Sequence, residues 1–480
     1  MKNQVKISDF DRTNVKSGII HIGVGNFHRA HQAFYTNLLL ESDPSQSSWG
    51  ICGVMLMPSD EKLYKTLKSQ DCLYSLTVCG RDGVNEAFEV GSIVELLWSG
   101  ENSQAVIDKI ADENIKIITL TITEGGYNID RATGDFMLCT PAIASDINNP
   151  ENPQSVFGYV AKGLRERIKS GAGAITILSC DNLQGNGNIT RNAFMTFFKA
   201  QDEELYRWAE QNITFPNSMV DRITPATKPE DVERLNNVND YPDQAPIYAE
   251  DFLQWVIEDN FAAGRPAWES VGVEFCDNVK LYEDMKLSLL NASHTLLSYP
   301  SFLMGYRNVD LAMGDKLIVE LVRQFMDIDI TPLLNTPVSV DLELYKKTLI
   351  ERFANHSVSD QVARLCFDGI SKFPTYIVPN LVKMLQGDGS LIRMAFLLAA
   401  YRHYLKYQCD DKGNEFDYAE PWITPSDIEK IGSDDVATFL KITPFDGVDF
   451  DSNISFMGLY ANACNQIKEW GVEATLKSIL

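Results

Sequence analysis

The sequence predicts an α/β protein of two domains: a doubly wound, mostly parallel sheet in the N-terminal part and a mostly α-helical C-terminal domain. Three observations support this prediction. The chain has 480 residues, which exceeds the size at which one hydrophobic core keeps growing. Apolar runs alternate with amphipathic stretches up to about residue 280, and beyond it the apolar patterns are helical. We therefore expect domains at residues 1–277 and 278–480.

The first predicted unit is a strand, a tight turn and a helix within residues 18–41. A short apolar run is followed by glycines and then by apolar positions that recur at three and four residues. A second apolar run covers residues 49–57, after which Pro58 and Ser59 indicate the start of a helix. These segments together predict a β-α-β unit.

Further buried strands are predicted at residues 73–78, 115–123 and 174–179. Strands that alternate with helices are typical of a parallel sheet covered by helices on both faces. In the C-terminal part, helical periodicity is found at residues 281–303, 315–328, 341–355 and 390–407.

The glycine turn after the first strand predicts a dinucleotide site. Gly23 and Gly25 open a helix, which lets the backbone approach a pyrophosphate held at the helix N-terminus. His28 replaces the third glycine of the usual fingerprint, so the pattern alone also fits a plain turn. His28, Arg29 and His31 add hydrogen-bonding or positive groups in an acidic protein. We expect a Rossmann-type site that includes Ile22, Gly23, Gly25, Asn26, Phe27, His28 and Arg29.

Asp60 lies just beyond the second predicted strand. A carboxylate at this place accepts hydrogen bonds from ribose hydroxyls and repels an additional phosphate, which favours NAD over NADP. The alternative is that Ser59 and Asp60 only cap the helix that begins there.

Four polar residues lie on one predicted helix: Glu283, Lys286, Asn291 and His294. At about 100° per residue they fall within an arc of about 140°, so they could face one cleft. A solvated surface lysine is the simpler interpretation of the spacing alone. The surrounding leucines predict a buried helix, however, and burial favours the neutral form of an amine. We therefore predict that Lys286 is the general base of an alcohol oxidation.

Such a reaction needs donors that hold the developing alkoxide, and asparagine amides are suitable. Asn291 is one candidate. Asn182 is another, because it follows the strand at 174–179 and ligands of open α/β sheets bind beyond strand ends. The chain has six histidines and no His-x-x-x-His pair in a helical context, so we expect no catalytic metal.

The composition argues against several other classes of protein. The formal net charge of -24 disfavours nucleic acid and anionic membranes as partners, although acidity also simply keeps a protein soluble. Nine cysteines without a Cys-x-x-Cys pair indicate reduced thiols. The polar first residues do not resemble a signal peptide, and no apolar run approaches about 18 residues. We expect a soluble, cytoplasmic protein.

Several motifs together resemble the polyol-specific long-chain dehydrogenase/reductase family over nearly the whole chain. They are GIIHIGVGNFHRAHQAFYTN, TLTITEGGYNID, SCDNLQGNG, FPNSMVDRITP, WVIEDNFAAGRPAWE, the Lys-x4-Asn-x2-His run from Lys286 and DGISKFP. The resemblance implies a Rossmann-type domain, a largely helical second domain, an active site in the cleft between them and no catalytic metal. The expected reaction is the reversible conversion of D-mannitol to D-fructose, with hydride transfer between C2 and NAD.

The resemblance also implies roles for individual residues. Lys286 matches the base of the family, and Asn182 and Asn291 match two amides that hold the reacting oxygen. His294 matches a residue that positions the substrate, and Glu283 matches one that gates the exit of the proton.

Further site residues follow from the resemblance alone. Glu124 matches a residue near the nicotinamide, and Asp221, Arg364 and Lys372 match residues that bind substrate hydroxyls. Without the resemblance, these three would be interpreted as surface charges. Charged groups suit a polyol because their buried positions penalise analogues that lack a hydroxyl.

Other activities remain open at the level of the sequence. Ser59 precedes Asp60 where family members often carry two carboxylates, which leaves open how strongly NADP is excluded. Met57 and Pro58 resemble the fructuronate reductase (D-mannonate oxidoreductase) branch, whereas Arg364 and SKFP resemble the mannitol enzymes. Arabinitol or sorbitol oxidation would use the same chemistry, and a nucleotide-binding sensor without catalysis is a different class. Similar enzymes are often monomers, although nothing in these residues excludes self-association.

Overall fold

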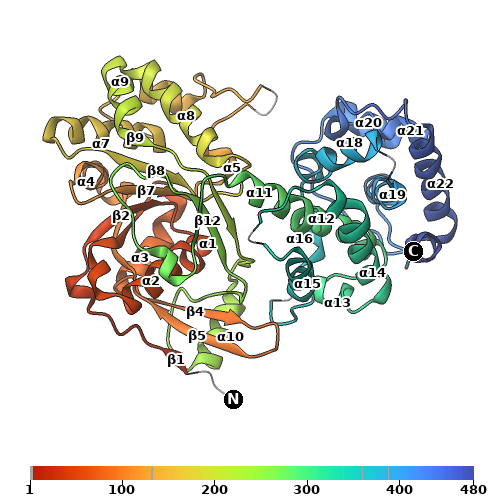
Figure 1. The fold of residues 1–480 in the computed structure, drawn as a ribbon, viewed down its shortest axis with the longest axis horizontal. Helices are drawn as coiled ribbons and strands as arrows, with labels where there is room; N and C mark the ends of the chain where they lie inside the picture. Colours follow the sequence, from red (N-terminus) through yellow and green to blue (C-terminus); the bar gives the residue numbers. More distant parts are fainter. Residues whose placement is uncertain (1–3, 131–132, 339, 359, 388) are drawn as a thin grey trace. The chain divides into compact units, whose positions relative to one another are not determined.

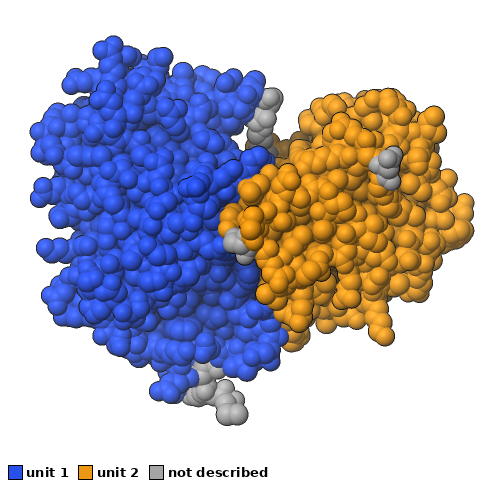
Figure 2. All heavy atoms as spheres, viewed as in Figure 1, with its two compact units in different colours: residues 1–280 blue, residues 281–480 orange. Residues whose placement is uncertain are grey.

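The computed structural model describes residues 4–130, 133–338, 340–358, 360–387 and 389–480. The chain divides into two compact units, Met1–Lys280 and Leu281–Leu480 (Figure 2). In the described residues, no helix combines the length and apolar character needed to cross a membrane. All nine cysteines lie among these residues, and each is a free thiol.

The main sheet of unit 1 has six parallel strands (Figure 1). Across the sheet they are β6 (Ile93–Trp98), β3 (Gly50–Met55), β2 (Ser17–Ile22), β7 (Ile117–Leu120), β8 (Ile175–Ser179) and β9 (Ile213–Thr214). Counted from β2, this is the strand order 3-2-1-4-5-6 of the Rossmann fold. The predicted Rossmann-type architecture is confirmed.

Helices cover both faces of this sheet because its strands are apolar on both sides. Ile19 of β2 belongs to one core, whereas Ile20 and Ile22 belong to another, as expected from the alternation of side chains along a strand. The helices of unit 1 are α1 (Asn26–Ala30), α2 (Gln32–Ser42), α3 (Glu61–Ser69), α4 (Ser99–Ala111), α5 (Thr123–Gly126), α6 (Pro141–Asn148), α7 (Val156–Ser170), α8 (Asn186–Gln201), α9 (Glu203–Asn212) and α10 (Pro229–Asn239).

Two smaller sheets complete unit 1. One contains β1 (Val5–Lys6), β5 (Asn85–Val90), β4 (Tyr74–Cys79) and β11 (Ile247–Glu250), and the other β10 (Ser218–Asp221), β12 (Gln254–Glu258) and β13 (Glu274–Cys276). The strand predicted at 73–78 is therefore not part of the parallel sheet: as β4 it pairs antiparallel with β5. A buried apolar run does not encode which sheet it joins.

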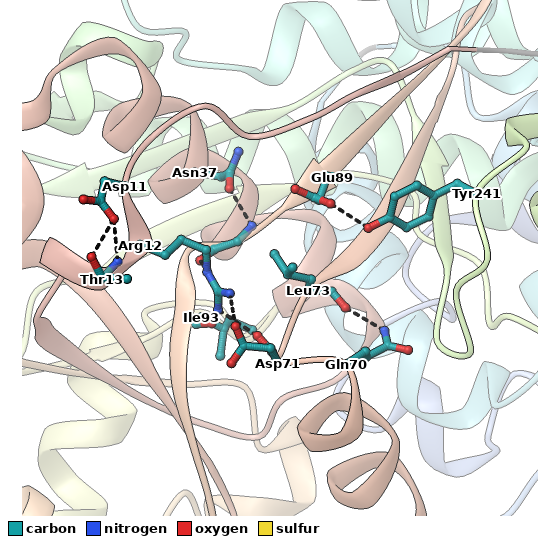
Figure 3. A network of polar contacts seen from close by, with 11 residues as sticks. Asp11, Arg12, Thr13, Asn37, Gln70, Asp71, Leu73, Glu89, Ile93 and Tyr241 are labelled. Atoms are coloured by element: carbon teal, nitrogen blue, oxygen red, sulfur yellow. Dashed lines mark hydrogen bonds and ion pairs between the residues drawn. The ribbon is translucent and has the colours of Figure 1, made fainter.

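Arg12 ties the first residues of the chain to these sheets (Figure 3). Its guanidinium group donates to the carbonyls of Gly91 and Ile93 and pairs with the carboxylate of Asp71 at 2.6 Å. Asn37 of α2 accepts a hydrogen bond from the Gly91 amide at 2.7 Å. These contacts fix the turn between β5 and β6 against α2.

Unit 2 is helical and has its own hydrophobic core, as predicted. Its helices are α11 (Lys280–Lys286), α12 (Ala292–Leu303), α13 (Val309–Ala312), α14 (Lys316–Gln324), α15 (Leu342–Phe353), α16 (Val362–Cys366), α17 (Gly369–Lys372), α18 (Val378–Gln386), α19 (Ile392–Tyr407), α20 (Pro425–Gly432), α21 (Val436–Phe439), α22 (Ile454–Trp470) and α23 (Val472–Ile479). In the described part of this unit, π-turns lie between these helices at Leu287–Asn291, Phe325–Ile330 and Phe373–Ile377. The apolar α19 is buried along most of its length and packs against α22.

Candidate active site

The glycine turn between β2 and α1 combines a positive φ at Gly23 with open space at Gly25. Gly23 adopts a φ of +101°, and a Cβ there would lie 2.1 Å from the carbonyl oxygen of Thr121, the residue that follows β7. Gly25 precedes α1, and a Cβ on it would meet only one atom, the Gly23 carbonyl oxygen at 4.0 Å. The space at Gly25 and the N-terminal amides of α1 fit a pyrophosphate.

His21 of β2 and His28 of α1 are buried, and burial favours their neutral forms. His28 stacks on His21, with ring centroids 3.3 Å apart. Burial lowers the pKa of His21 to about 3, and burial together with the neighbouring His21 lowers that of His28 well below its ordinary value. Neither ring nitrogen of His28 has a hydrogen-bond partner among the described residues. Burial thus favours the neutral ring, so of the two roles considered for His28, hydrogen bonding fits better than positive charge, and its contact with a cofactor stays a prediction.

Arg29 points into unit 1. Its guanidinium group donates to the Ala245 carbonyl at 2.6 Å and to Oδ1 of Asn26 at 2.7 Å. Asn26 in turn donates to the carbonyl of Pro225 and to the hydroxyl of Thr227. These two residues hold the start of α1 to distant segments of the chain, and their contact with a cofactor stays a prediction. Phe27 is half-buried and stacks on His31, with centroids 5.0 Å apart.

Asp60 lies just after β3, as predicted, and is half-buried. Its Oδ2 accepts a hydrogen bond from the Met57 amide at 2.9 Å, so the carboxylate caps the short 3-10 helix Pro58–Asp60. Capping is one of the two roles considered for Asp60, and the ribose contact stays a prediction.

Two predicted site residues lie at the carboxyl ends of neighbouring strands in unit 1. Glu124 is exposed on α5 after β7, and Asn182 is exposed after β8. Between them, Asp181 accepts hydrogen bonds from the amides of Ile122 and Thr123, at 2.9 and 3.0 Å. The turn that carries Glu124 and the turn that carries Asn182 are thus joined by one carboxylate.

Asp221 ends β10 and is 5% exposed. The amide of Asn186 links this strand to the turn after β8: it donates to the carbonyl of Ser218 at 2.8 Å and to that of Asp181 at 3.1 Å. Asn186 therefore holds the Asn182 turn to the strand that ends in Asp221.

The helix that carries the predicted base changes its winding at Lys286. α11 ends at this residue, the π-turn covers Leu287–Asn291, and α12 follows. The four residues lie on one continuous helical stretch, as predicted, but its winding differs from the uniform α-helix that the expected arc assumed. Because a π-turn takes about one residue more per turn, a separation of five residues comes closer to a full turn. Asn291 therefore lies nearer to the face of Lys286 than a uniform α-helix would place it.

The polar groups of this helix are largely shielded from solvent. Glu283 and Lys286 are each 6% exposed. Oδ1 of Asn291 is buried and has no hydrogen-bond partner among the described residues. A rotation of the side-chain amide by about 180° exchanges its oxygen and nitrogen. After this rotation the amide of Asn291 can donate a hydrogen bond to a ligand oxygen at this position. The π-turn Leu287–Asn291 contacts the π-turn Phe373–Ile377, which directly follows Lys372.

The predicted hydroxyl-binding residues of unit 2 form a charged cluster. Nζ of Lys372 donates to the carbonyls of Arg364 and Leu365, at 3.2 and 3.0 Å, which leaves one of its three hydrogens for a ligand among the described contacts. Nε of Arg364 donates to Asp360 at 2.8 Å. Burial and the positive charge of Arg364 lower the pKa of Lys372.

His294 belongs to the same cluster. Burial raises the pKa of Asp360, but the ion pair with Arg364 outweighs it, and His294 lowers this pKa further, so the net shift is downward. The His294 ring also packs on Phe353, with centroids 4.2 Å apart. The structure thus gathers His294, Arg364 and Lys372 within unit 2.

Sequence reasoning missed the residues that hold the site in shape. Neither Asp181 nor Asp360 belongs to a motif of its own. The one available signal for Asp181 was its position directly before Asn182 and after a buried strand, where a carboxylate can bind the amides of a neighbouring turn. The π-turn had no sequence signal. As for metals, the described residues contain no group of three histidine, cysteine or carboxylate side chains that could hold an ion.

Comparison with known proteins identifies the family. Residues 17–270 match the family described as the mannitol dehydrogenase Rossmann domain, and residues 278–468 match the mannitol dehydrogenase C-terminal domain. A polyol:NADP oxidoreductase of Gluconobacter oxydans is 41% identical over 92% of this chain and 91% of its own length. A mannitol 2-dehydrogenase of Aspergillus fumigatus is 38% identical over 98% of this chain and 95% of its own.

Two solved structures share the fold of the whole chain. The structure of Pseudomonas fluorescens mannitol 2-dehydrogenase, a ternary complex with NAD and D-mannitol, has a TM-score of 0.86 and 39% identity over 99% of this chain and 96% of its own. A D-sorbitol dehydrogenase in substrate-free form has a TM-score of 0.91 and 38% identity over 99% of this chain and all of its own. Matches to both family domains and full-length likeness to these structures lead to one conclusion: this chain belongs to the mannitol dehydrogenase family of oxidoreductases.

Proposed function

We propose that this protein is an NAD-dependent polyol dehydrogenase that interconverts D-mannitol and D-fructose, with Lys286 as the general base. The observation that carries the proposal is the placement of Lys286. In a family of polyol oxidoreductases, it is a nearly buried amine at the start of a π-turn that ends at Asn291. π-turns occur frequently at functional sites, and burial favours the neutral amine that a base requires.

The side chains of this chain would divide the work as follows. Nζ of Lys286 accepts the proton of the C2 hydroxyl, and Glu283, one turn earlier on α11, passes it on to solvent. The amides of Asn182 and Asn291 donate hydrogen bonds to the oxygen as its negative charge grows. A bound NAD would supply the acceptor for the hydride of C2.

Substrate recognition would come from the charged cluster of unit 2 and from Asp221. His294, Arg364 and Lys372 offer donors to the polyol hydroxyls, and Asp221 offers an acceptor. Hydrogen bonds from charged donors are stronger than those between neutral groups, which suits an uncharged polyol. The contacts of Lys372 and Arg364 with Leu365 and Asp360 fix the direction of their donors.

The choice of NAD follows from Asp60. Its carboxylate lies beyond β3, where it would repel the additional phosphate of NADP. The NADP-linked relative from Gluconobacter oxydans shows that relatives differ in this choice. Activity should therefore be measured with each cofactor at equal concentration, and NADP that supports faster turnover than NAD would contradict this part of the proposal.

Replacement of the base tests the mechanism. Lys286→Ala should lower kcat for mannitol oxidation by about 10³-fold, because a general base contributes about 10² to 10⁴. NADH binding, followed by fluorescence titration, should change little. Lys383→Ala on α18, where the lysine is exposed, is the matched control and should retain full turnover. Substantial turnover by Lys286→Ala would refute the role of this residue.

Sorbitol is the second candidate substrate. The D-sorbitol dehydrogenase structure fits this chain with a higher TM-score than the mannitol enzyme does, at nearly the same identity. Initial rates of NAD reduction with mannitol, sorbitol, arabinitol and mannonate separate the alternatives. The proposal expects the highest kcat/KM with mannitol, and a higher value for mannonate would point to fructuronate reduction.

A further inference from the structure

The first residue of α5 is strained. Thr123 has a φ of +62°, in the left-handed region that a β-branched residue rarely adopts. Such a conformation persists only where the surroundings hold it. Thr123 itself is exposed, so side-chain packing does not supply that restraint.

A single carboxylate supplies the restraint. Oδ1 of Asp181 accepts from the Thr123 amide at 3.0 Å, and Oδ2 accepts from the Ile122 amide at 2.9 Å. The buried hydroxyl of Tyr127, at the other end of α5, lies 2.7 Å from the same Oδ2. Both ends of α5 are thus bound to one side chain on the neighbouring strand end.

The protonation state of this carboxyl group matters for its contacts. Tyr127 also lies 2.5 Å from the hydroxyl of Ser179, so a relay in which Ser179 donates to Tyr127 and Tyr127 to Asp181 satisfies every group. An ionised carboxylate accepts all three hydrogen bonds, whereas a protonated one becomes a donor on one oxygen. At least one of the three contacts is then weakened.

We propose that Asp181 is a positioning residue for cofactor binding: its carboxylate clamps the strained turn that carries Glu124, and the turn relaxes when the negative charge is lost. This inference rests on the proposed place of Glu124 near the nicotinamide and of Asn182 at the reacting oxygen. Asp181 acts through the two turns on which these residues lie.

Ionisation of Asp181 falls within an accessible pH range. Burial raises its pKa to about 6, although the bonds from Tyr127, Ile122 and Thr123 lower it, and the negative charge of Glu124 adds to the rise. The residue before Asp181 is Cys180. Burial raises the pKa of the Cys180 thiol well above its ordinary value, so this thiol stays neutral. α8 and β10 contribute the neutral Asn186 and Ser218. The clamp therefore strengthens as pH rises through about 6 and weakens as pH falls through this value.

The first test is the Kd of NADH for the full-length protein between pH 5 and pH 8, without substrate. For the wild type we expect NADH to bind several-fold more weakly below pH 6. Asp181→Asn should bind about 10-fold more weakly at pH 8 and show little pH dependence. Asp202→Asn is the matched control, because Asp202 likewise accepts from two backbone amides, at the start of α9. It should behave like the wild type.

A rescue experiment separates positioning from general destabilisation. Glycine adopts a φ of +62° without strain, so Thr123→Gly should restore most of the NADH affinity of Asp181→Asn but not its pH dependence. If Asp181→Asn does not fold, Tyr127→Phe serves instead: loss of a donor to the charged form should move the midpoint of the wild-type pH profile upward.

Some results would overturn the inference. A wild-type Kd that is constant from pH 5 to pH 8, or a loss in Asp181→Asn that Thr123→Gly does not repair, leaves Asp181 without a positioning role. Because no polyol is present, these outcomes do not depend on whether mannitol is the substrate or Lys286 the base.

Discussion

Burial determines how the polar residues around the glycine turn behave. His21 and His28 form a stacked pair in the interior, where the low pKa of each keeps it neutral. Arg29 donates to a backbone carbonyl and to the side-chain amide oxygen of Asn26. If this turn holds the cofactor phosphates, as proposed, the binding would depend on backbone amides and the helix dipole rather than on histidine charge. The glycines that expose these amides are then the residues most sensitive to change.

Gly23 and Gly25 should respond differently to alanine. In Gly23→Ala the new methyl group would overlap the Thr121 carbonyl at a φ that alanine avoids, so we expect a loss of stability of about 3 kcal/mol together with loss of NADH binding. In Gly25→Ala the methyl group has space, so the Tm should stay the same while NADH affinity falls, because the group occupies the pyrophosphate region. Thermal unfolding and fluorescence titration measure both. Equal Tm values for the two variants would contradict this assignment.

At the scale of elements, both units use the same device to hold a helix start. In unit 1 it is Asp181 at α5. In unit 2, Glu420 accepts from the amides of Gly369 and Ile370, each at 3.0 Å, and from the hydroxyl of Tyr401 at 3.1 Å. α5 begins at Thr123 and α17 follows Asp368, and both of these residues have a left-handed φ. α5 carries the predicted site residue Glu124, and α17 carries Lys372. α17 ends with Lys372, so Glu420 holds the backbone next to the charged cluster of His294, Arg364 and Lys372.

Glu420 should make stability depend on pH. Burial raises its pKa to about 7, above the ordinary value of 4.5. The folded protein therefore retains a proton that the unfolded chain releases, and the free energy of unfolding should fall as pH rises from about 4.5 to 7, by about 3 kcal/mol. Urea unfolding of the wild type and Glu420→Gln at pH 5, 6, 7 and 8 measures this contribution. Parallel pH profiles of the two proteins would contradict it.

Arg167 of α7 is a fully buried guanidinium that binds backbone carbonyls. It donates to carbonyl oxygens of Ile110, Asp112, Ile115, Ala172, Gly173 and Ala174 at distances between 2.7 and 3.3 Å. Arg167→Met leaves these acceptors unsatisfied, so we expect a loss of about 3 kcal/mol in the free energy of unfolding.

The neighbouring Arg165 provides the control for this prediction. It is partly exposed and pairs with Asp202 at 3.2 Å, an interaction worth less than about 1 kcal/mol at a surface. Urea unfolding of Arg167→Met and Arg165→Met should therefore give clearly different midpoints, and similar midpoints would show that the carbonyl contacts contribute little.

At the scale of the whole molecule, the net charge opposes the approach of an anionic cofactor. The formal charge is -24, and NADH is also negative, so their long-range interaction is repulsive. Added salt screens this repulsion. The association rate constant of NADH, measured by stopped-flow fluorescence, should rise about two-fold as ionic strength increases from about 10 to 150 mM. A rate constant that falls with salt would instead reveal a dominant positive potential at the binding edge.

Local patterns were sufficient for most of the architecture. The strands predicted around residues 18, 49, 115 and 174 all lie in the six-stranded sheet, because parallel strands buried on both faces are continuous apolar runs. The strand at 73–78 exists but joins another sheet, since its partners β5 and β11 are chosen by contacts between distant segments.

The amino-acid sequence alone determined the Rossmann-type sheet, the helical second unit and the residues that match the polyol dehydrogenase motifs, because periodicity and motif spacing are local properties of the chain. The tertiary structure decided the neutral state of His28 and the clamp of Asp181. The tertiary structure also determined how closely Asn291 lies to the helix face of Lys286, because the π-turn between them packs against the π-turn Phe373–Ile377. Burial and hydrogen bonding between distant segments arise only when the chain is folded, so no window of the sequence contains them.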